Sequence, residues 1–132
     1  MRINDHPVAI IGAGPVGLSA AAHLLDRGIP FVVFEAGDQS GASLNQWGHV
    51  RMFSPWGYNI DKKAGELLAQ SGWVAPPSDA YPTGRELLAQ YLQPLSELAP
   101  IKRCLKTHHR VMAVSRVGHD VMRSQDRAAA PF

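Results

Sequence analysis

The stretch Val8-Ala-Ile-Ile-Gly-Ala-Gly-Pro-Val-Gly17 decides the fold of this chain of 132 residues. Its first four residues are apolar and mostly β-branched, which predicts a short strand that is buried on both faces. Three glycines then follow at once with the spacing Gly12-x-Gly14-x-x-Gly17. The stretch therefore predicts a strand that runs directly into a glycine-rich turn.

A helix and a second strand are expected after this turn. Apolar residues recur at helical spacing up to Arg27, and Gly28 stands where a helix usually ends. The run from Pro30 to Phe34 predicts a second buried strand, which leads into Glu35. Two strands joined by a helix form a parallel pair, so this segment predicts an α/β fold. The residues expected to face the sheet are Val16, Ala20, Ala21, Leu24 and Leu25.

Each glycine of the turn has a separate physical role in a dinucleotide site. Gly12 permits the tight turn out of the strand, Gly14 lets a diphosphate approach the backbone, and Gly17 lets the helix pack closely on the strand. The helix begins near Pro15 and Val16. Its first amides and the positive end of its dipole favour a phosphate group there. The alternative is that the glycines serve only as a turn, but the flanking strand and helix favour the dinucleotide site.

Glu35 supplies the acid that such a site needs. It lies 23 positions after Gly12, at the end of the second predicted strand and directly before Ala36. A carboxylate there accepts hydrogen bonds from a ribose diol and repels a 2′-phosphate, so we expect this site not to prefer NADP. The competing interpretation is a solvated acid at the end of a strand.

The segment from Gly37 to Asp61 is rich in glycine, serine and aromatic residues and has no clear periodicity, which is typical of a functional loop. Within it, Arg51 fits either a clamp on a phosphate or ribose or a surface ion pair. Three aromatic residues can either wall a planar ligand or fill the core, and the core is the favoured interpretation. They are Trp47, Phe53 and Trp56.

Two further helices are predicted beyond the loop. Asp61 is expected to cap a helix that runs to about residue 71, and the proline-rich segment 73–82 then predicts a connector. The sequence Thr83-Gly-Arg-Glu86 is a capping box that begins the second helix. Because Pro94 cannot donate a backbone hydrogen bond, we expect a kink there or two short helices.

From Ile101 onward the pattern favours strands. Cys104 is expected in a strand, and alternation from Val111 to Arg116 predicts another. The pair Gly118-His119 is expected to turn a hairpin into Asp120–Ser124.

Composition excludes several classes of protein. The net charge of +2 is too small to favour nucleic acid as a partner, and no apolar run is long enough to cross a membrane. The N-terminus lacks a signal-peptide core, and the single cysteine favours a reducing compartment, so we expect a cytoplasmic protein. With one cysteine and no clustered carboxylates, we expect no metal site.

The first 35 residues resemble the N-terminal FAD-binding segment of flavoproteins with two dinucleotide-binding domains. That superfamily includes flavin-containing monooxygenases, Baeyer–Villiger monooxygenases and thioredoxin-reductase-like enzymes, and Gly12-Ala-Gly-Pro15 is a form of the motif often seen there for FAD. Four later segments resemble a bacterial group of FAD-dependent oxidoreductases near the flavin-binding monooxygenases. They are Trp47–Trp56, Gly72-Trp73, Pro82–Gly84 and Tyr91–Leu95.

The resemblance implies FAD as the cofactor and a set of residues that hold it. The glycines would surround the diphosphate, Glu35 would hold the adenosine ribose, Arg51 would lie near the dinucleotide, and the backbone of Val111 would meet the adenine. The full implied set is Gly12, Gly14, Pro15, Val16, Gly17, Glu35, Ala36, Arg51 and Val111. NADPH or NADH would be a co-substrate only in a full-length protein.

The chain departs from this superfamily in length. Residues 1–132 are expected to form a single, partial Rossmann-like domain with a parallel sheet, added helices and a β-meander that is cut short. No second glycine motif and no Cys-x-x-Cys pair is present, so we expect neither a nicotinamide-binding domain nor a disulfide-reductase mechanism. A truncated parallel sheet leaves an open edge, which predicts self-association or a tail that covers the edge.

Three functions are compatible with these observations. The favoured one is the FAD-binding portion of a flavin-dependent, monooxygenase-like oxidoreductase, in which no catalytic residue of this chain can be named. The second is a truncated, non-catalytic dinucleotide-binding module. The third is a minimal NAD-dependent dehydrogenase, for which 132 residues leave little room.

Overall fold

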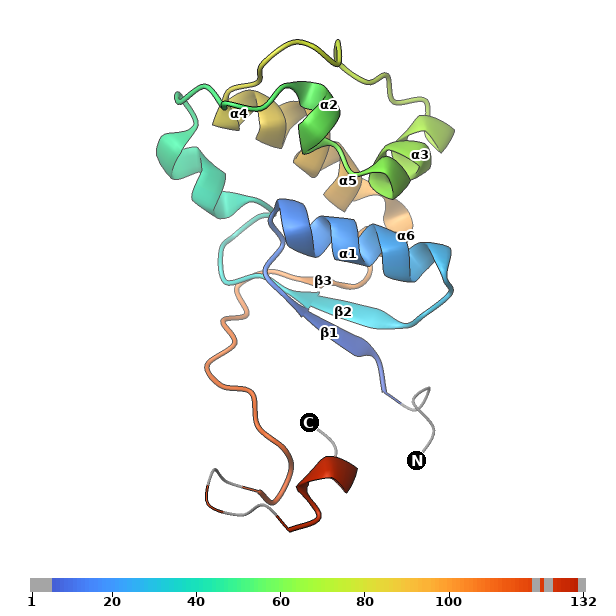
Figure 1. Ribbon diagram of the computed structural model, residues 1–132, viewed down its shortest axis with the longest axis vertical. Helices are drawn as coiled ribbons and strands as arrows, with labels where there is room; N and C mark the ends of the chain where they lie inside the picture. Colours follow the sequence, from blue (N-terminus) through green and yellow to red (C-terminus); the bar gives the residue numbers. More distant parts are fainter. Residues whose placement is uncertain (1–5, 120–121, 123–124, 131–132) are drawn as a thin grey trace.

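A parallel sheet carries most of the helices on one of its faces, and the C-terminal segment extends away below it (Figure 1). The computed structural model describes residues 6–119, 122 and 125–130. The strands β1 (Val8–Ile11), β2 (Phe31–Phe34) and β3 (Leu105–Lys106) pair in the order β1-β2-β3. Both pairings are parallel. The predicted α/β fold with a parallel sheet is thereby confirmed.

Helix α1 (Pro15–Asp26) connects β1 to β2 and packs on the sheet. It ends as predicted, because Gly28 adopts a φ of 65° and donates its amide to the carbonyl of Leu25 at 3.1 Å. Of the residues expected to face the sheet, Ala21 is buried and Ala20, Leu24 and Leu25 pack against the core, so the prediction was wrong only for Val16. Leu18, Ala21 and Ala22 are the buried residues of α1. Val16 is 84% exposed, because the close contact of Gly17 with the turn fixes the rotation of the helix.

Most of the remaining helices lie above α1, whereas η4 lies away from them in the C-terminal segment below the sheet (Figure 1). Their buried side chains and those of α1 and the sheet form one hydrophobic core, which includes Leu68, Tyr91, Leu92 and Leu95. The bounds of these helices are η2 Ala42–Trp47, α2 Trp56–Asn59, α3 Lys62–Gln70, α4 Gly84–Leu87, η3 Leu88–Leu92, α5 Gln93–Glu97, α6 Ala99–Lys102 and η4 Arg127–Ala129.

Asp61 begins α3, as predicted, and also joins three elements. Its side chain accepts a hydrogen bond from the amide of Ala64 at 3.0 Å and lies 3.0 Å from Nε2 of His23 on α1. Its own amide donates to the hydroxyl of Tyr91 at 3.1 Å. Burial raises the pKa of that tyrosine. Burial would also raise the pKa of Asp61, but the bonds from Ala64 and His23 outweigh burial and lower it.

The second predicted helix is broken into three parts. Thr83 and Glu86 form the expected capping box at the start of α4. A π-helical turn, η3, follows, and α5 then begins with Pro94 in its first turn. In an α-helix Pro94 would leave the carbonyl of Gln90 unpaired. That carbonyl instead accepts a hydrogen bond from the indole nitrogen of Trp73 at 2.8 Å.

The first strand is less buried than its sequence predicts. Only Ile10 of β1 is buried, while Val8 and Ile11 are 42% and 59% exposed. Two features explain the difference. The helices cover one face of the sheet, and β1 lies at one edge of it (Figure 1).

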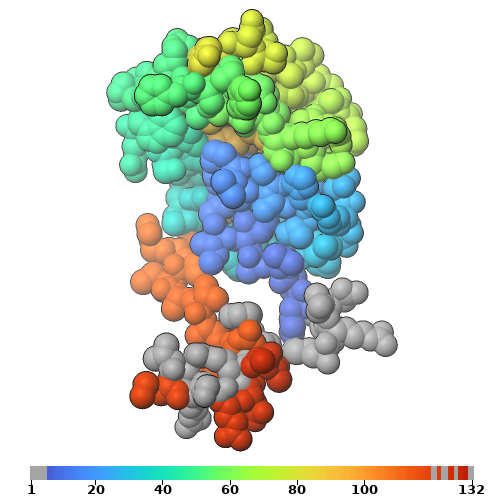
Figure 2. Space-filling view, viewed as in Figure 1, coloured from blue at the N-terminus to red at the C-terminus, as the bar shows by residue number. Residues whose placement is uncertain are grey.

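The expected β-meander does not form within the described residues. Ile101 lies in α6, Cys104 lies in a turn just before β3, and residues 107–119 contain no strand. This segment leads away from the helices and the sheet, so its alternating residues have no neighbouring strand to pair with (Figures 1 and 2). The hairpin expected in 120–124 falls mostly outside the described residues, which include only Met122 there.

Within the described residues, no helix is both long enough and apolar enough to cross a membrane.

Candidate functional site

The glycine turn has the geometry that each glycine was predicted to provide. Gly12 adopts a φ of 95°, which favours glycine, and its amide donates to the carbonyl of Phe34 at 2.7 Å. A Cβ on Gly17 would lie 1.9 Å from the carbonyl oxygen of Gly12. A Cβ on Gly14 would meet no atom within 4 Å. The helix is therefore pressed against the turn at Gly17, while the backbone at Gly14 lies open.

The first turn of α1 is open to a negatively charged ligand. Gly14 is the N-cap residue and supplies no side-chain cap, and no acidic residue lies in the first helical turn. The first amides of a helix have no partner within the helix and lie at the positive end of its dipole. Pro15 occupies the first helical position, and the exposed Val16 follows it. Such a turn offers backbone donors to a diphosphate.

Glu35 lies beside this turn, as its position after β2 predicts. Its carboxylate accepts hydrogen bonds from the amide of Ala13 at 2.8 Å and from the amide of Gly37 at 2.7 Å. The side chain is half-buried and Ala36 is exposed. Because an ionised carboxylate has about four lone-pair sites, these two bonds leave capacity for a hydroxyl donor. Glu35 thus holds the glycine turn to the loop after β2.

Three residues of the site were missed by the sequence reasoning. Ala13 is fully buried between the turn and the loop, and its carbonyl accepts a hydrogen bond from Gly41 at 2.9 Å. Gly41 adopts a φ of 65°. A Cβ on Gly37 would lie 2.5 Å from the Cβ of Ala42. The signal was present in the sequence, because two glycines follow the acid at positions 37 and 41.

The chain after β3 returns to the same edge of the sheet. The amide of His108 donates to Gly37 and that of His109 donates to Glu35, both at 2.9 Å. Val111 is half-buried and follows two residues later, so about 7 Å of chain separates it from His109. The segment proposed to meet the adenine therefore begins beside Glu35.

Arg51 does not contact the glycine turn or Glu35, and its contacts lie with the segment before α4. It forms an isolated antiparallel bridge with Thr83, and its guanidinium donates to the carbonyl of Tyr81. None of the ion pairs found among the described residues includes Arg51, so the surface ion pair is not formed.

The aromatic residues Trp47, Phe53 and Trp56 do not form one wall for a planar ligand. Trp56 is buried in the core, whereas Phe53 is fully exposed and Trp47 is 37% exposed.

Within the part of the chain that the structure describes, no three His, Cys, Asp or Glu residues gather closely enough to hold a metal ion.

A parallel βαβ unit with a glycine turn, an uncapped helix N-terminus and an acid after the second strand defines a Rossmann-like dinucleotide-binding domain. Comparison with known proteins narrows this class. The model of the DAO family, FAD dependent oxidoreductases, matches residues 7–128. The chain belongs to this family of FAD-dependent oxidoreductases.

Curated relatives match parts of the chain. A thiamine thiazole synthase from Pyrobaculum calidifontis is 43% identical over 47 residues, which is 36% of this chain and 18% of that protein. The indole-3-pyruvate monooxygenase YUCCA1 from Oryza sativa subsp. japonica is 38% identical over 74 residues, which is 56% of this chain and 16% of that protein. The chain thus spans less than a fifth of the length of these two relatives.

Solved structures share the fold. OTEMO in complex with FAD and NADP superposes with a TM-score of 0.65 at 19% identity over 89% of this chain and 22% of that one. A steroid monooxygenase bound to NADP gives 0.58 at 24% identity, over 76% and 19% of the two chains. The bacillithiol disulfide reductase Bdr from Staphylococcus aureus gives 0.62 at 22% identity, over 83% and 30%.

Proposed function

We propose that this chain binds the ADP moiety of FAD and forms the FAD-binding part of a monooxygenase-like oxidoreductase. One observation supports the proposal above all others. The glycine turn leads into an uncapped helix N-terminus, and the carboxylate of Glu35 is tied to the same turn at 2.8 Å. A diphosphate and the ribose next to it need these two groups side by side.

The residues present fit this part of FAD. The open space over Gly14 would admit the diphosphate, with Gly12, Pro15, Val16 and Gly17 around it. The remaining acceptor sites of Glu35 would take the ribose hydroxyls. Ala36 and the backbone of Val111 would border the adenosine. Arg51 would first have to release the carbonyl of Tyr81, so its role near the dinucleotide is the least supported.

Bound FAD would supply the redox chemistry, while the residues of this chain would bind and orient it. In a longer protein, NADPH or NADH would serve as the co-substrate. The monooxygenase direction is supported by the names of the relatives and neighbours, which include YUCCA1 and a steroid monooxygenase.

Ligand-dependent stability tests the proposal. Because a ligand that binds only the native state must raise stability, ADP and FAD should both raise the melting temperature of the 132-residue chain. NADP should do so less, because Glu35 repels its 2′-phosphate. If the purified protein shows flavin absorbance that corresponds to about one FAD molecule per chain, the FAD site is competent. Absence of any effect of ADP and FAD would refute the proposal.

Two observations would favour the other functions. Colourless protein that is stabilised equally by ADP and FAD would indicate a non-catalytic module that holds only the ADP portion. Clear preference for NAD over FAD would indicate a minimal dehydrogenase.

As part of the same proposal, we propose a cytoplasmic location. Cys104 is a free cysteine, and proteins without disulfides are typical of reducing compartments.

A further inference from the structure

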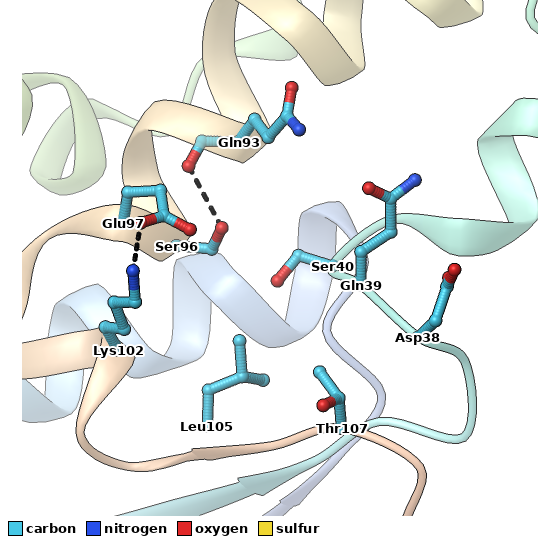
Figure 3. A pocket seen from close by; sticks show the side chains of 9 residues that line it. All are labelled: Asp38, Gln39, Ser40, Gln93, Ser96, Glu97, Lys102, Leu105 and Thr107. Atoms are coloured by element: carbon cyan, nitrogen blue, oxygen red, sulfur yellow. Dashed lines mark hydrogen bonds and ion pairs between the residues drawn. The ribbon is translucent and has the colours of Figure 1, made fainter.

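A cavity lies on the helix-covered side of the sheet, away from the glycine turn. Its volume is about 300 Å³, and it is lined by the loop after β2, by α5, by the end of α6 and by β3 (Figure 3). Leu105 of β3 pairs with the buried Val33, and Thr107 lies two residues further along, on the same face. None of the residues assigned to FAD lines this cavity.

The wall of the cavity carries buried hydroxyl groups. Ser40 and Ser96 are 3% and 5% exposed, and they are the buried polar residues of the described chain. Both line this one cavity. The hydroxyl of Ser96 donates to the carbonyl of Gln93 at 3.0 Å.

The hydroxyl of Ser40 has no partner. It is buried, and it points into the cavity (Figure 3). A buried hydroxyl without a hydrogen bond is destabilising, so native structures nearly always satisfy such groups with protein, water or ligand. The cavity is the space that the Ser40 hydroxyl faces, so a partner for it would lie there. The volume far exceeds the ~15 Å³ that one water molecule needs, so there is room for a larger molecule.

The other lining groups limit the chemistry of the occupant. Thr107 adds a hydroxyl, and Gln39 and Gln93 add amides, which both donate and accept hydrogen bonds. Among the charged residues, Lys102 is paired with Glu97, and Asp38 adds a second carboxylate. The charged groups therefore sum to a net negative charge, which repels a phosphate or carboxylate ligand.

We propose that this cavity is a binding site for a small, uncharged, polyhydroxylated molecule of about the size of a pentose, anchored on Ser40 and Thr107. Hydroxyl groups of such a ligand would both donate to and accept from the serine and threonine. This site is separate from the glycine turn and does not depend on the proposed binding of FAD.

NMR titration of the 132-residue chain with D-ribose tests the site. Amide signals of Ser40, Ser96 and Thr107 should shift and saturate, while those of Gly17 and Glu35 should not. Ser40→Ala should weaken the affinity about tenfold, because one hydrogen bond is lost. Ser43→Ala is the matched control, since Ser43 is exposed and does not line the cavity, and it should leave the affinity unchanged. Ribose 5-phosphate should bind more weakly at these amides than D-ribose does.

Thr107→Val provides a second variant of unchanged shape and should weaken the affinity by a similar factor. The inference is overturned if the shifts grow without saturating, which would mean that water alone fills the cavity. It is also overturned if Ser40→Ala and Thr107→Val respond to D-ribose as the unaltered chain does, or if ribose 5-phosphate binds these amides more tightly. Because the readout lies in the cavity, it does not depend on the outcome with ADP or FAD.

Discussion

Gly14 and Gly17 both belong to the glycine motif, but the space around their Cα atoms differs. At Gly14 a Cβ would meet nothing within 4 Å, whereas at Gly17 it would overlap the carbonyl of Gly12 at 1.9 Å. The first glycine therefore leaves space for a ligand, and the second permits the fold. Substitution of each one separates binding from stability.

Gly14→Ala should fold normally and lose affinity for ADP. Its φ of −85° suits alanine, so we expect a loss of stability of about 1 kcal/mol or less. The new methyl group would stand where the diphosphate approaches, which should weaken binding of ADP at least about tenfold, or ~1.4 kcal/mol. Gly17→Ala should instead cost about 3 kcal/mol or more in urea unfolding, because backbone atoms must move. Tight ADP binding by Gly14→Ala would contradict this account.

The sequence alone predicts the conformation and position of residues whose role depends on their neighbours along the chain. The conformations of Gly12 and Gly17 and the position of Glu35 follow from spacing that the printed sequence already contains. Ala13 and Ser40 were not foreseen, because their burial depends on a contact between the turn and a loop more than twenty residues away. Nothing in the pattern around Phe53 distinguishes its full exposure from the burial of Trp56.

At the scale of elements, helix caps and breaks were predictable because their causes lie within a few residues. Asp61 caps α3, the capping box begins α4, and Pro94 follows the π-helical turn η3 that interrupts the helix. The missing β-meander was not predictable, because alternation from Val111 onward makes a strand only where another strand is present to pair with it.

The Asp61 cap should make stability depend on pH in the acid range. Because its pKa is lowered below 3.8 in the folded state, the charged cap stabilises the protein above about pH 4, and this contribution is lost as pH falls through the lowered pKa. Asp61→Asn keeps a capping side chain but carries no charge. The unaltered chain should therefore lose more unfolding free energy between about pH 6 and pH 3 than this variant does.

Urea unfolding at a series of pH values measures the difference. The matched control is Asp79→Asn, which removes an exposed acid and should keep the pH dependence of the unaltered chain. Identical pH profiles for Asp61→Asn and the unaltered chain would show that the cap carries no such charge effect.

The indole of Trp73 should stabilise the break in the second helix. Trp73→Phe keeps an aromatic ring near Tyr91 but removes the donor to the carbonyl of Gln90, so we expect a loss of about 1 kcal/mol in urea unfolding. Trp47→Phe serves as the control, because its ring packs on Gly84 and it should cost less. An equal loss in both variants would assign the effect to ring size instead of the hydrogen bond.

At the scale of the whole molecule, the sheet formed by the described residues has β1 as an edge strand. Val8 and Gly12 direct their amides toward β2, so the alternate residues Ala9 and Ile11 direct theirs away from it. The exposed side chains of Val8 and Ile11 lie on this same edge strand. An unpaired apolar edge strand is a template for pairing with another chain.

We therefore predict that the chain self-associates through β1. Light scattering should show a mass that rises with concentration, and Ile11→Lys should shift it toward the monomer, because a charge on an edge strand opposes pairing. Val74→Lys is the control, since Val74 is also an exposed apolar residue but lies in the connector before α4. A monomer at all concentrations would count against this prediction.

The exposure of β1 also marks the limit of sequence reasoning at this scale. An apolar run predicts burial only if both faces of its sheet are covered, and here helices cover one face (Figure 1). The α/β class and the parallel pairing of β1 with β2 through α1 follow from the first thirty-five residues. How the rest of the sheet is covered depends on neighbours that no local pattern specifies.

A crystal structure of the chain grown with ADP tests the central claim most directly. We predict density for the diphosphate against the first turn of α1, over Gly14, with the ribose hydroxyls within hydrogen-bond distance of Glu35. An ADP molecule bound elsewhere on the chain, or a groove at Gly14 that stays empty at saturating ADP, would contradict the account.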